Sequence, residues 1–317
     1  MQDIFAWWQR GSKALLPNAA LSLPLLDATE IAELAQRLTH TRASALSPQE
    51  VAHRRLGESR SVFRGSGMDY DESRPFLPGD DPRAIDWRLT ARSGVSHVKL
   101  FREERRPATF ILLDRRAAMR FGTRHRLKVT QAARVATLAA FDAQHRQSAL
   151  AGVLLEGNPQ WLRESAHGDA ALRFAELAAM PAPPCSPSGE PDLQDMLAQL
   201  SRLLVRGSQV WLISDLHDLS PACRGPLLAL ASEHQLRCVH IIDPAELALP
   251  EAGVLRLYPR SDGQGQAIDS RDPQLRRQYH EAATAFHAER EDLVRALQIP
   301  YVRLLSDTEA VEQVLPR

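Results

Sequence analysis

The sequence has few cysteines and no long apolar run, and each absence excludes a class of protein. Its 317 residues contain three widely spaced cysteines, Cys185, Cys223 and Cys238, with no CxxC pair. Neither a disulfide framework nor a cysteine-ligated zinc site is expected, and reduced thiols in the cytoplasm fit this count best. No apolar run approaches the roughly 18–20 residues that cross a bilayer. The N-terminus has an early acidic residue and is not a signal peptide.

Net charge is also absent, which argues against a nucleic-acid partner. Lys plus Arg and Asp plus Glu both number 39, so the formal net charge is zero. Residues 51–126 hold 17 basic and 10 acidic residues, a local excess of seven, but the two signs are interleaved and neutralise one another. No recognition motif or aromatic stacking pattern accompanies them, and we expect no nucleic-acid binding.

The common catalytic motifs are missing as well. There is no Walker A loop, no GxGxxG and no HExxH. The Gly-Ser-Gly run at 65–67 lacks the preceding strand and the following helix that a nucleophile elbow requires. His217 lies between Asp215 and Asp218, a weak acid–base pattern that is more typical of a solvated loop. We therefore expect no enzymatic activity and no cofactor.

A regular alternation of apolar strands and helical segments begins after residue 107. Apolar runs predict buried strands that begin at Thr109, Ala149, Gln209, Arg237 and Tyr301. Hairpins are predicted where residues 160–163 follow the second strand and at 254–269. Strands that alternate with helices predict an α/β domain with a doubly wound, mostly parallel sheet.

Upstream of this α/β pattern the sequence predicts two further parts. Residues 1–60 are predicted to be a helical N-terminal segment, residues 61–106 a small β-rich element, and residues 107–317 the α/β domain. The β-rich element has strand-like pieces at 61–63 and 97–101. For Trp7-Trp8 three interpretations stay open: contact with a membrane surface, contact with a partner, and packing on the chain's own domain.

The most unusual segment alternates charges around one Pro-Gly turn and one Trp. It reads RPFLPGDDPRAIDWRLTAR, and its distinctive residues are Arg74, Pro78, Gly79, Asp80, Asp81, Arg83, Asp86, Trp87 and Arg92. One interpretation is a clasp that holds the β-rich element on the main sheet, with Asp86 and Trp87 packed under the turn. The other is a surface on which a partner docks. The clasp is favoured, because half-buried Arg–Asp pairs confer geometry more reliably than stability.

This segment and the strand after it resemble the bacterial domain-of-unknown-function 58 family. The resemblance covers about residues 45–310. Its motifs are Gly65, Gly67, Asp69-Tyr70, Arg74, Phe76, Pro78-Gly79-Asp80-Asp81, Arg83, Ile85-Asp86-Trp87, Ala91-Arg92, Asp114, Ile213-Ser214-Asp215 and Asp243-Pro244-Ala245-Glu246. It implies a von Willebrand factor A-like fold of the short, soluble type, without N-terminal transmembrane helices. It also implies a partner, because members are typically encoded beside MoxR-type AAA+ ATPases.

The resemblance further implies a place for Mg²⁺, the metal-ion-dependent adhesion site of von Willebrand A domains. That site combines an Asp-x-Ser-x-Ser loop with a Thr and a second Asp, all oxygen ligands suited to a hard cation. The corresponding positions here are Asp114, Arg116, Ala118, Pro191 and Asp215. All three hydroxyls are absent, so the site looks degenerate and no metal is expected.

Two hypotheses stay open for Arg116. It pairs with both Asp114 and Asp215 in place of the ion, because two carboxylates at adjacent strand ends otherwise repel each other. Alternatively, it points to solvent while both carboxylates cap helices.

These observations together predict a non-enzymatic protein-interaction module. The resemblance implies an adaptor or partner of a MoxR-type AAA+ ATPase, and of other von Willebrand A proteins, in a chaperone-like or complex-maturation role. The alternative is a Mg²⁺-dependent von Willebrand A adhesion module, and a third candidate is a cryptic hydrolase.

Overall fold

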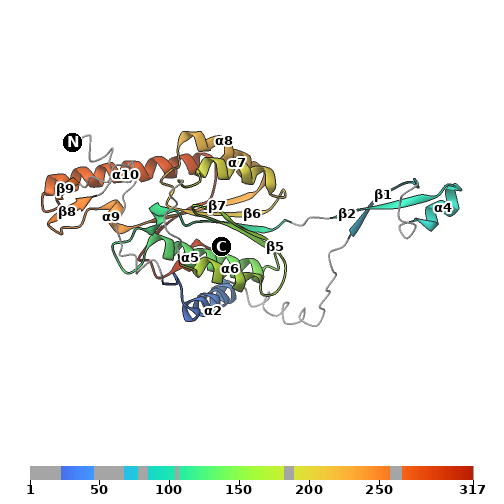
Figure 1. The fold of residues 1–317 in the computed structure, drawn as a ribbon, viewed down its shortest axis with the longest axis horizontal. Coiled ribbons are helices and arrows are strands. Elements are labelled where there is room, and N and C mark those ends of the chain that lie inside the picture. The colour runs from blue at the N-terminus through green and yellow to red at the C-terminus, as the bar shows by residue number, and fades with distance from the viewer. Residues whose placement is uncertain are drawn as a thin grey trace. The chain divides into compact units, whose positions relative to one another are not determined.

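The computed structural model describes residues 23–45, 68–77, 85–103, 107–181, 189–257 and 266–316. The chain divides into two units (Figure 1). The larger unit comprises residues 1–45 and 107–317, and the smaller unit comprises residues 46–106.

A six-stranded sheet forms the centre of the larger unit. Its strands are β3 (Thr109–Asp114), β4 (Leu150–Leu155), β5 (Gln160–Ser165), β6 (Gln209–Ser214), β7 (Gln235–Ile242) and β10 (Tyr301–Leu305). They lie in the order β10-β7-β6-β3-β4-β5; the pairs from β10 to β4 are parallel, and the edge strand β5 is antiparallel to β4. The chain starts in the middle of the sheet and winds first to one side and then to the other, which makes the sheet doubly wound.

Helices cover both faces of this sheet (Figure 1). One face carries α2 (Ala28–Ala45), α5 (Lys128–His145) and α6 (Ala170–Ala179), and the other carries α7 (Leu193–Leu203), α8 (Arg224–Glu233) and α10 (Pro273–Ala296). Alternate residues of a strand point to opposite faces. Accordingly, Ile111 and Leu113 join the core under α5, whereas Phe110 and Leu112 join the core under α7.

Shorter elements complete the larger unit. They are η3 (Ala117–Arg120), η4 (Pro221–Cys223), α9 (Pro244–Leu247), η5 (Val311–Val314) and the hairpin of β8 (Val254–Leu257) and β9 (Gln266–Asp269). The predicted α/β class and the predicted order of strands and helices after residue 107 are confirmed. Within the described ranges, no helix is both long and apolar enough to span a bilayer. Cys223 and Cys238 are free and buried.

The helix before the ionic segment belongs to the larger unit, which differs from the predicted division of the chain. We expected residues 1–60 to form a separate segment, but α2 buries Ile31, Leu34 and Leu38 in the core that it shares with α5. Arg42 fixes the contact, because its Nη2 and Nε lie 2.6 and 2.9 Å from Oδ1 of the buried Asp142. An amphipathic helix without a core of its own has to bury its apolar stripe on a neighbour. Trp7-Trp8 lies outside the described residues.

The smaller unit contains an antiparallel strand pair and one short helix. Strand β1 (Met68–Pro75) pairs with β2 (His97–Glu103), and α4 (Trp87–Ser93) precedes β2. Helix α4 begins at Asp86, whose carboxylate accepts the backbone N–H groups of residues 88 and 89 at 3.1 Å each. The predicted strand at 97–101 is confirmed, and the predicted piece at 61–63 lies outside the described residues.

Candidate functional site

The carboxyl ends of β3 and β6 meet where the sheet reverses its winding direction. These two strands are parallel neighbours, and the chain continues from them to opposite sides of the sheet. Doubly wound sheets bind ligands at such a point. Asp114 is the last residue of β3, Asp215 follows β6 directly, and both are buried.

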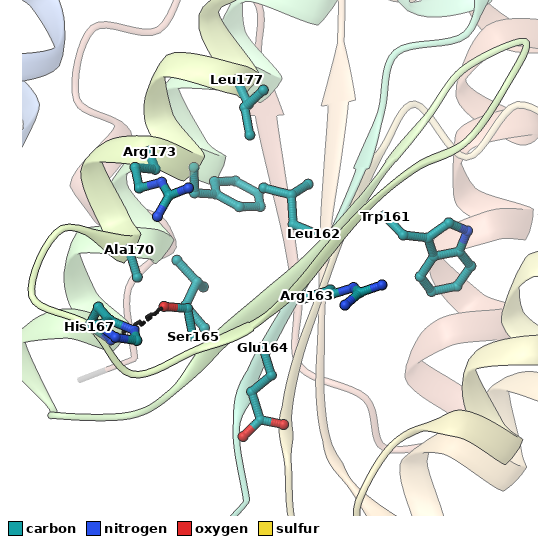
Figure 2. A pocket seen from close by; sticks show the side chains of 11 residues that line it. Trp161, Leu162, Arg163, Glu164, Ser165, His167, Ala170, Arg173 and Leu177 are labelled. Atoms are coloured by element: carbon teal, nitrogen blue, oxygen red, sulfur yellow. Dashed lines mark hydrogen bonds between the residues drawn. The ribbon is translucent and has the colours of Figure 1, made fainter.

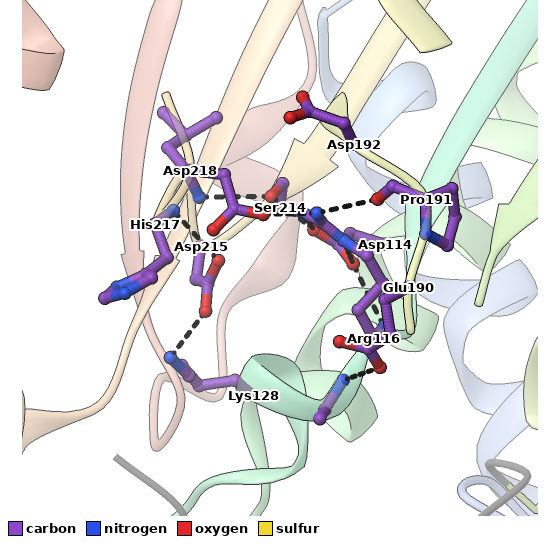
Figure 3. A network of polar contacts seen from close by, with 12 residues as sticks. Asp114, Arg116, Lys128, Glu190, Pro191, Asp192, Ser214, Asp215, His217 and Asp218 are labelled. Atoms are coloured by element: carbon purple, nitrogen blue, oxygen red, sulfur yellow. Dashed lines mark hydrogen bonds and ion pairs between the residues drawn. The ribbon is translucent and has the colours of Figure 1, made fainter. Parts of the chain in front are cut away.

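Arg116 neutralises Asp114 from within the same loop (Figure 3). Its Nε lies 3.0 Å from Asp114 Oδ1 and its Nη2 lies 2.8 Å from Asp114 Oδ2, so the pair is bidentate. The third nitrogen, Nη1, donates to the Pro191 carbonyl at 3.2 Å and to Asp218 Oδ2. Burial alone would lower the pKa of Arg116, but Asp114, Asp218 and Asp215 raise it above its ordinary value. The guanidinium is therefore held charged.

A second cation, Lys128, holds Asp215. Lys128 is the first residue of α5, and its Nζ lies 2.9 Å from Asp215 Oδ2 and 2.5 Å from Glu246 Oε1. Burial opposes the charged form of both partners, yet their mutual attraction raises the pKa of Lys128 and lowers the pKa of Asp215 well below its usual range. The pKa of Glu246 is raised, mainly by burial. Lys128 and Asp215 therefore form the ion pair, with Glu246 as a weaker third member.

The hypothesis that one arginine serves both carboxylates is half right. Arg116 pairs with Asp114, as predicted, and its exposure of 4% contradicts the alternative in which it points to solvent. Asp215 pairs with Lys128 instead. One signal for Lys128 was available in the sequence: a basic residue in the first turn of an apolar helix opposes the helix dipole and needs a compensating anion.

The remaining positions of the predicted metal site, Pro191 and Ala118, contribute no polar side chain to the network. Pro191 supplies only its carbonyl to Arg116, and Ala118 lies in η3. Ser214, which the sequence matched to the family motif without assigning a role, donates its hydroxyl to Asp114 Oδ2 at 2.7 Å. The third strand-end carboxylate, Asp243, accepts hydrogen bonds from residues 123 and 306 and caps α9, so it acts as a structural group.

This network does not fit a divalent cation. A hard cation needs several oxygen ligands directed at one point. Both carboxylate oxygens of Asp114 already accept two hydrogen bonds each: Oδ1 from the backbone N–H and Nε of Arg116, and Oδ2 from Nη2 of Arg116 and the hydroxyl of Ser214. The fixed charges of Arg116 and Lys128 would also repel the ion. Among the residues that the structure describes, no group of three or more His, Cys, Asp or Glu side chains is placed to hold a metal.

The structure describes part of the ionic segment Arg74–Arg92. Asp86 caps α4, and Arg92 is exposed. The predicted packing of Trp87 under the turn is wrong: Trp87 is 69% exposed, and α4 buries none of its residues. Arg74 donates its Nη1 to the adjacent Pro75 carbonyl at 3.1 Å. The rest of the predicted segment lies outside the described residues, including Pro78, Gly79, Asp80, Asp81 and Arg83.

A separate cavity of about 430 Å³ lies between the edge strand β5 and helix α6 (Figure 2). It contains a serine–histidine contact, with Ser165 Oγ 3.1 Å from His167 Nδ1. The same Oγ accepts the backbone N–H of His167 at 3.3 Å, which marks a local turn. Such a pair acts as nucleophile and base only when a third group orients the histidine. In the part of the chain that the structure describes, the ring and the backbone N–H of His167 form hydrogen bonds to Ser165 and to no carboxylate. The cavity therefore lends no support to a hydrolase.

Two buried histidines lie near Lys128, and we expect the fold to lose stability in acid because a buried ring resists protonation. His240 on β7 and His287 on α10 have ring centroids 5.1 Å apart. Burial, together with the positive charges of Lys128, Arg303 and Arg290, lowers the pKa of His287 from 6.5 to about 3. The stabilisation from neutral His287 is complete above pH 6.5 and is lost toward pH 3, by about 1.4 kcal/mol per pH unit. The free energy of unfolding should fall by about 3 kcal/mol between pH 7 and pH 4 from this group.

Urea unfolding at pH 7 and pH 4 measures this effect. The variant His287→Gln should lose most of the group's contribution to the pH dependence. His280→Gln is the matched control, because His280 lies on the same helix and is exposed. An unchanged pH dependence in His287→Gln would contradict the assignment.

The sheet defines the class of this protein. When its six strands are numbered along the chain, their order is 3-2-1-4-5-6, with paired carboxylates at the switch point between the first and fourth strands. This is a doubly wound α/β domain, the architecture that the von Willebrand factor A resemblance implied. The chain belongs to the family described as protein of unknown function DUF58, whose model matches residues 72–289. The family predicted from the ionic segment is thereby confirmed.

The relatives found for this chain are uncharacterized proteins. Rv1480 of Mycobacterium tuberculosis and Mb1516 of Mycobacterium bovis are each 29% identical over 269 residues, which cover 82% of this chain and 81% of the relative. Similar solved structures include an aerotolerance-related membrane protein from Bacteroides fragilis, at 12% identity and a TM-score of 0.41 over 66% of this chain and 96% of that chain. The SpRpn10 VWA domain matches at 12% identity and a TM-score of 0.31, over 66% of this chain and 93% of that chain. The doubly wound α/β class follows from the chain's own sheet order.

Proposed function

We propose that this chain is a non-catalytic protein-interaction module in which two side-chain cations stand where related domains hold a metal ion. The observation that carries the proposal is the double pairing of Arg116 with Asp114 and of Lys128 with Asp215. General acid–base catalysis works best with a pKa near the working pH. The pKa values of Arg116 and Lys128 are raised and that of Asp215 is lowered, so all three move away from neutrality. This direction supports a binding role over a catalytic one.

The partner that we propose is a MoxR-type AAA+ ATPase, with other von Willebrand A proteins in the same cytoplasmic complex. Membership of the DUF58 family supports this choice. The exposed Trp87 also supports an interaction role, because protein interfaces are enriched in aromatic side chains. The role is that of an adaptor in a chaperone-like or complex-maturation process.

Copurification with the ATPase encoded beside this protein tests the adaptor role. We expect a complex at micromolar concentration and an ATPase rate that changes when this protein is added. If neither a complex nor a rate change is found, the adaptor proposal fails.

Calorimetric titration with Mg²⁺ and Mn²⁺ separates this proposal from a metal-dependent adhesion module. We expect no stoichiometric binding heat, because both strand-end carboxylates already hold cations. Stoichiometric binding that is lost in Asp114→Asn would establish the metal-dependent alternative. This variant keeps the shape of the side chain, and its circular dichroism spectrum separates a loss of binding from a loss of folding.

A further inference from the structure

The two sides of the Arg116 guanidinium are held differently. On its inner side, Nε and Nη2 are bound to Asp114, whose side chain is 1% exposed. On its outer side, Nη1 donates to the Pro191 carbonyl at 3.2 Å and to Oδ2 of Asp218, whose side chain is 34% exposed. A buried cation thus presents its outer nitrogen to a carboxylate that water can reach (Figure 3).

The loop that carries Asp218 is fixed at its backbone. Leu216 is fully buried, and its N–H is bound to Ser214 Oγ at 3.1 Å. Arg290 on α10 holds the same loop through two hydrogen bonds, from Nε to the Leu216 carbonyl at 3.0 Å and from Nη2 to the His217 carbonyl at 3.1 Å. A rotamer change of Asp218 is therefore enough to open the outer side of Arg116, without movement of the loop.

We propose that Arg116 is a binding site for a carboxylate side chain of a protein partner. Asp218 is then an internal carboxylate that occupies this site and is displaced when the partner's Asp or Glu binds. The proposal rests on the proposed function as an interaction module and adds the chemistry of the partner, an exposed acidic side chain.

A carboxylate is the group that this site exchanges most readily. A partner carboxylate restores the charge-assisted hydrogen bond that Asp218 gives up, while the released Asp218 is hydrated. When Asp218 turns outward, both buried carboxylates keep their cations: Asp114 keeps Arg116, and Asp215 keeps Lys128. Arg290 stays hydrogen-bonded to the backbone of the loop. An approaching basic side chain would meet the positive charges of Arg116 and Arg290 behind Asp218.

The direct test uses the full ¹⁵N-labelled chain and sodium acetate as the probe. The Nε–H resonance of Arg116, assigned by its loss in Arg116→Lys, reports occupancy of the site. An internal competitor reduces the apparent affinity to the intrinsic affinity multiplied by the fraction of molecules in which the site is open. Asp218→Asn and Asp218→Ala should therefore bind acetate about tenfold more tightly than the unsubstituted chain. Sodium chloride at equal ionic strength controls for screening.

Asp192→Asn is the matched control, because Asp192 is an exposed carboxylate that caps α7 through the N–H of Gln194. Its acetate affinity should equal that of the unsubstituted chain. No acetate-dependent shift in either Asp218 variant, or equal affinities in all four proteins, would overturn the proposal.

Binding of the neighbouring ATPase gives a second test, in which the direction of the change in affinity decides the outcome. Asp218→Asn should bind the neighbouring ATPase about tenfold more tightly, because the internal competitor is weakened. Weaker binding would mean that Asp218 itself contacts a basic group, and this also overturns the proposal. If the ATPase binds neither protein, the adaptor role fails and the acetate titration still decides the carboxylate site.

Discussion

Replacing Arg116 with methionine is expected to lower the free energy of unfolding by about 3–5 kcal/mol. Methionine keeps an unbranched, flexible apolar stem and removes the guanidinium. Asp114, whose side chain is 1% exposed, is then left as a buried carboxylate without a cation. Breaking a buried pair from one side costs more than the pair contributes, because the remaining charge cannot regain water.

Urea unfolding followed by circular dichroism measures this loss. The matched control is Arg271→Met, which removes the partner of Asp269 in a pair whose side chains are 64% and 47% exposed. That exposed pair should contribute far less to the free energy of unfolding, because solvent screens the two charges. The double variant Arg116→Met/Asp114→Asn should recover part of the stability, since it removes both charges. A loss below about 1 kcal/mol for Arg116→Met would show that Asp114 is neutralised by another group.

Lys128→Met is expected to have a comparable effect at pH 7, about 3–5 kcal/mol. The substitution leaves two carboxylates that shared one ammonium group, the buried Asp215 and the part-buried Glu246. Their pKa values should then rise, because burial and mutual repulsion both disfavour the charged forms.

The stability that Lys128→Met loses should depend on pH, and the directions of the carboxylate pKa shifts say how. In the unsubstituted chain the pKa of Asp215 is lowered, so its stabilisation is present above the unfolded pKa and is lost as pH falls through the folded value. In Lys128→Met the carboxylates have raised folded pKa values, and protonation relieves them as pH falls. The difference between the two proteins should therefore shrink between pH 7 and pH 4.5.

Unfolding experiments at both pH values, combined with a double-mutant cycle of Lys128→Met and Asp215→Asn, check this prediction. A coupling energy of about 1.5 kcal/mol or more is expected for a buried, contacting pair. The control is Arg206→Met at the exposed pair with Glu233, whose side chains are 81% and 37% exposed. A deficit that grows as the pH falls would contradict the assignment of Lys128 as the partner of Asp215.

The elements of the α/β unit could be predicted because their signals are local. The run Thr109–Asp114 is apolar at every position before its final Asp except the first, as a strand buried on both faces requires, and all six residues are buried. The Ala-rich segment that follows this strand forms helix α5 over Lys128–His145. The attachment of α2 could not be predicted, because an amphipathic stripe shows that a helix is covered without showing what covers it.

The same limit applies to Trp87. A tryptophan in a dense ionic segment favours packing, yet Trp87 is exposed. The exposure of a side chain depends on what the rest of the unit places beside it, and α4 offers no buried position. The ends of α4, which the sequence analysis did not predict as a helix, are set locally, because Asp86 and Gly94 terminate the helix with their own side-chain and backbone groups.

The sequence by itself determined the α/β class, the family, the carboxylates at the strand ends and the absence of hydroxyls at Arg116, Ala118 and Pro191. These properties depend on residue identity and short-range periodicity, which are visible without coordinates. Only the tertiary structure decided which cation meets which carboxylate. Lys128 and Asp215 are 87 residues apart in the chain and meet because α5 begins beside the carboxyl end of β6. Charge pairing across a sheet depends on distance in space, and packing alone determines that distance.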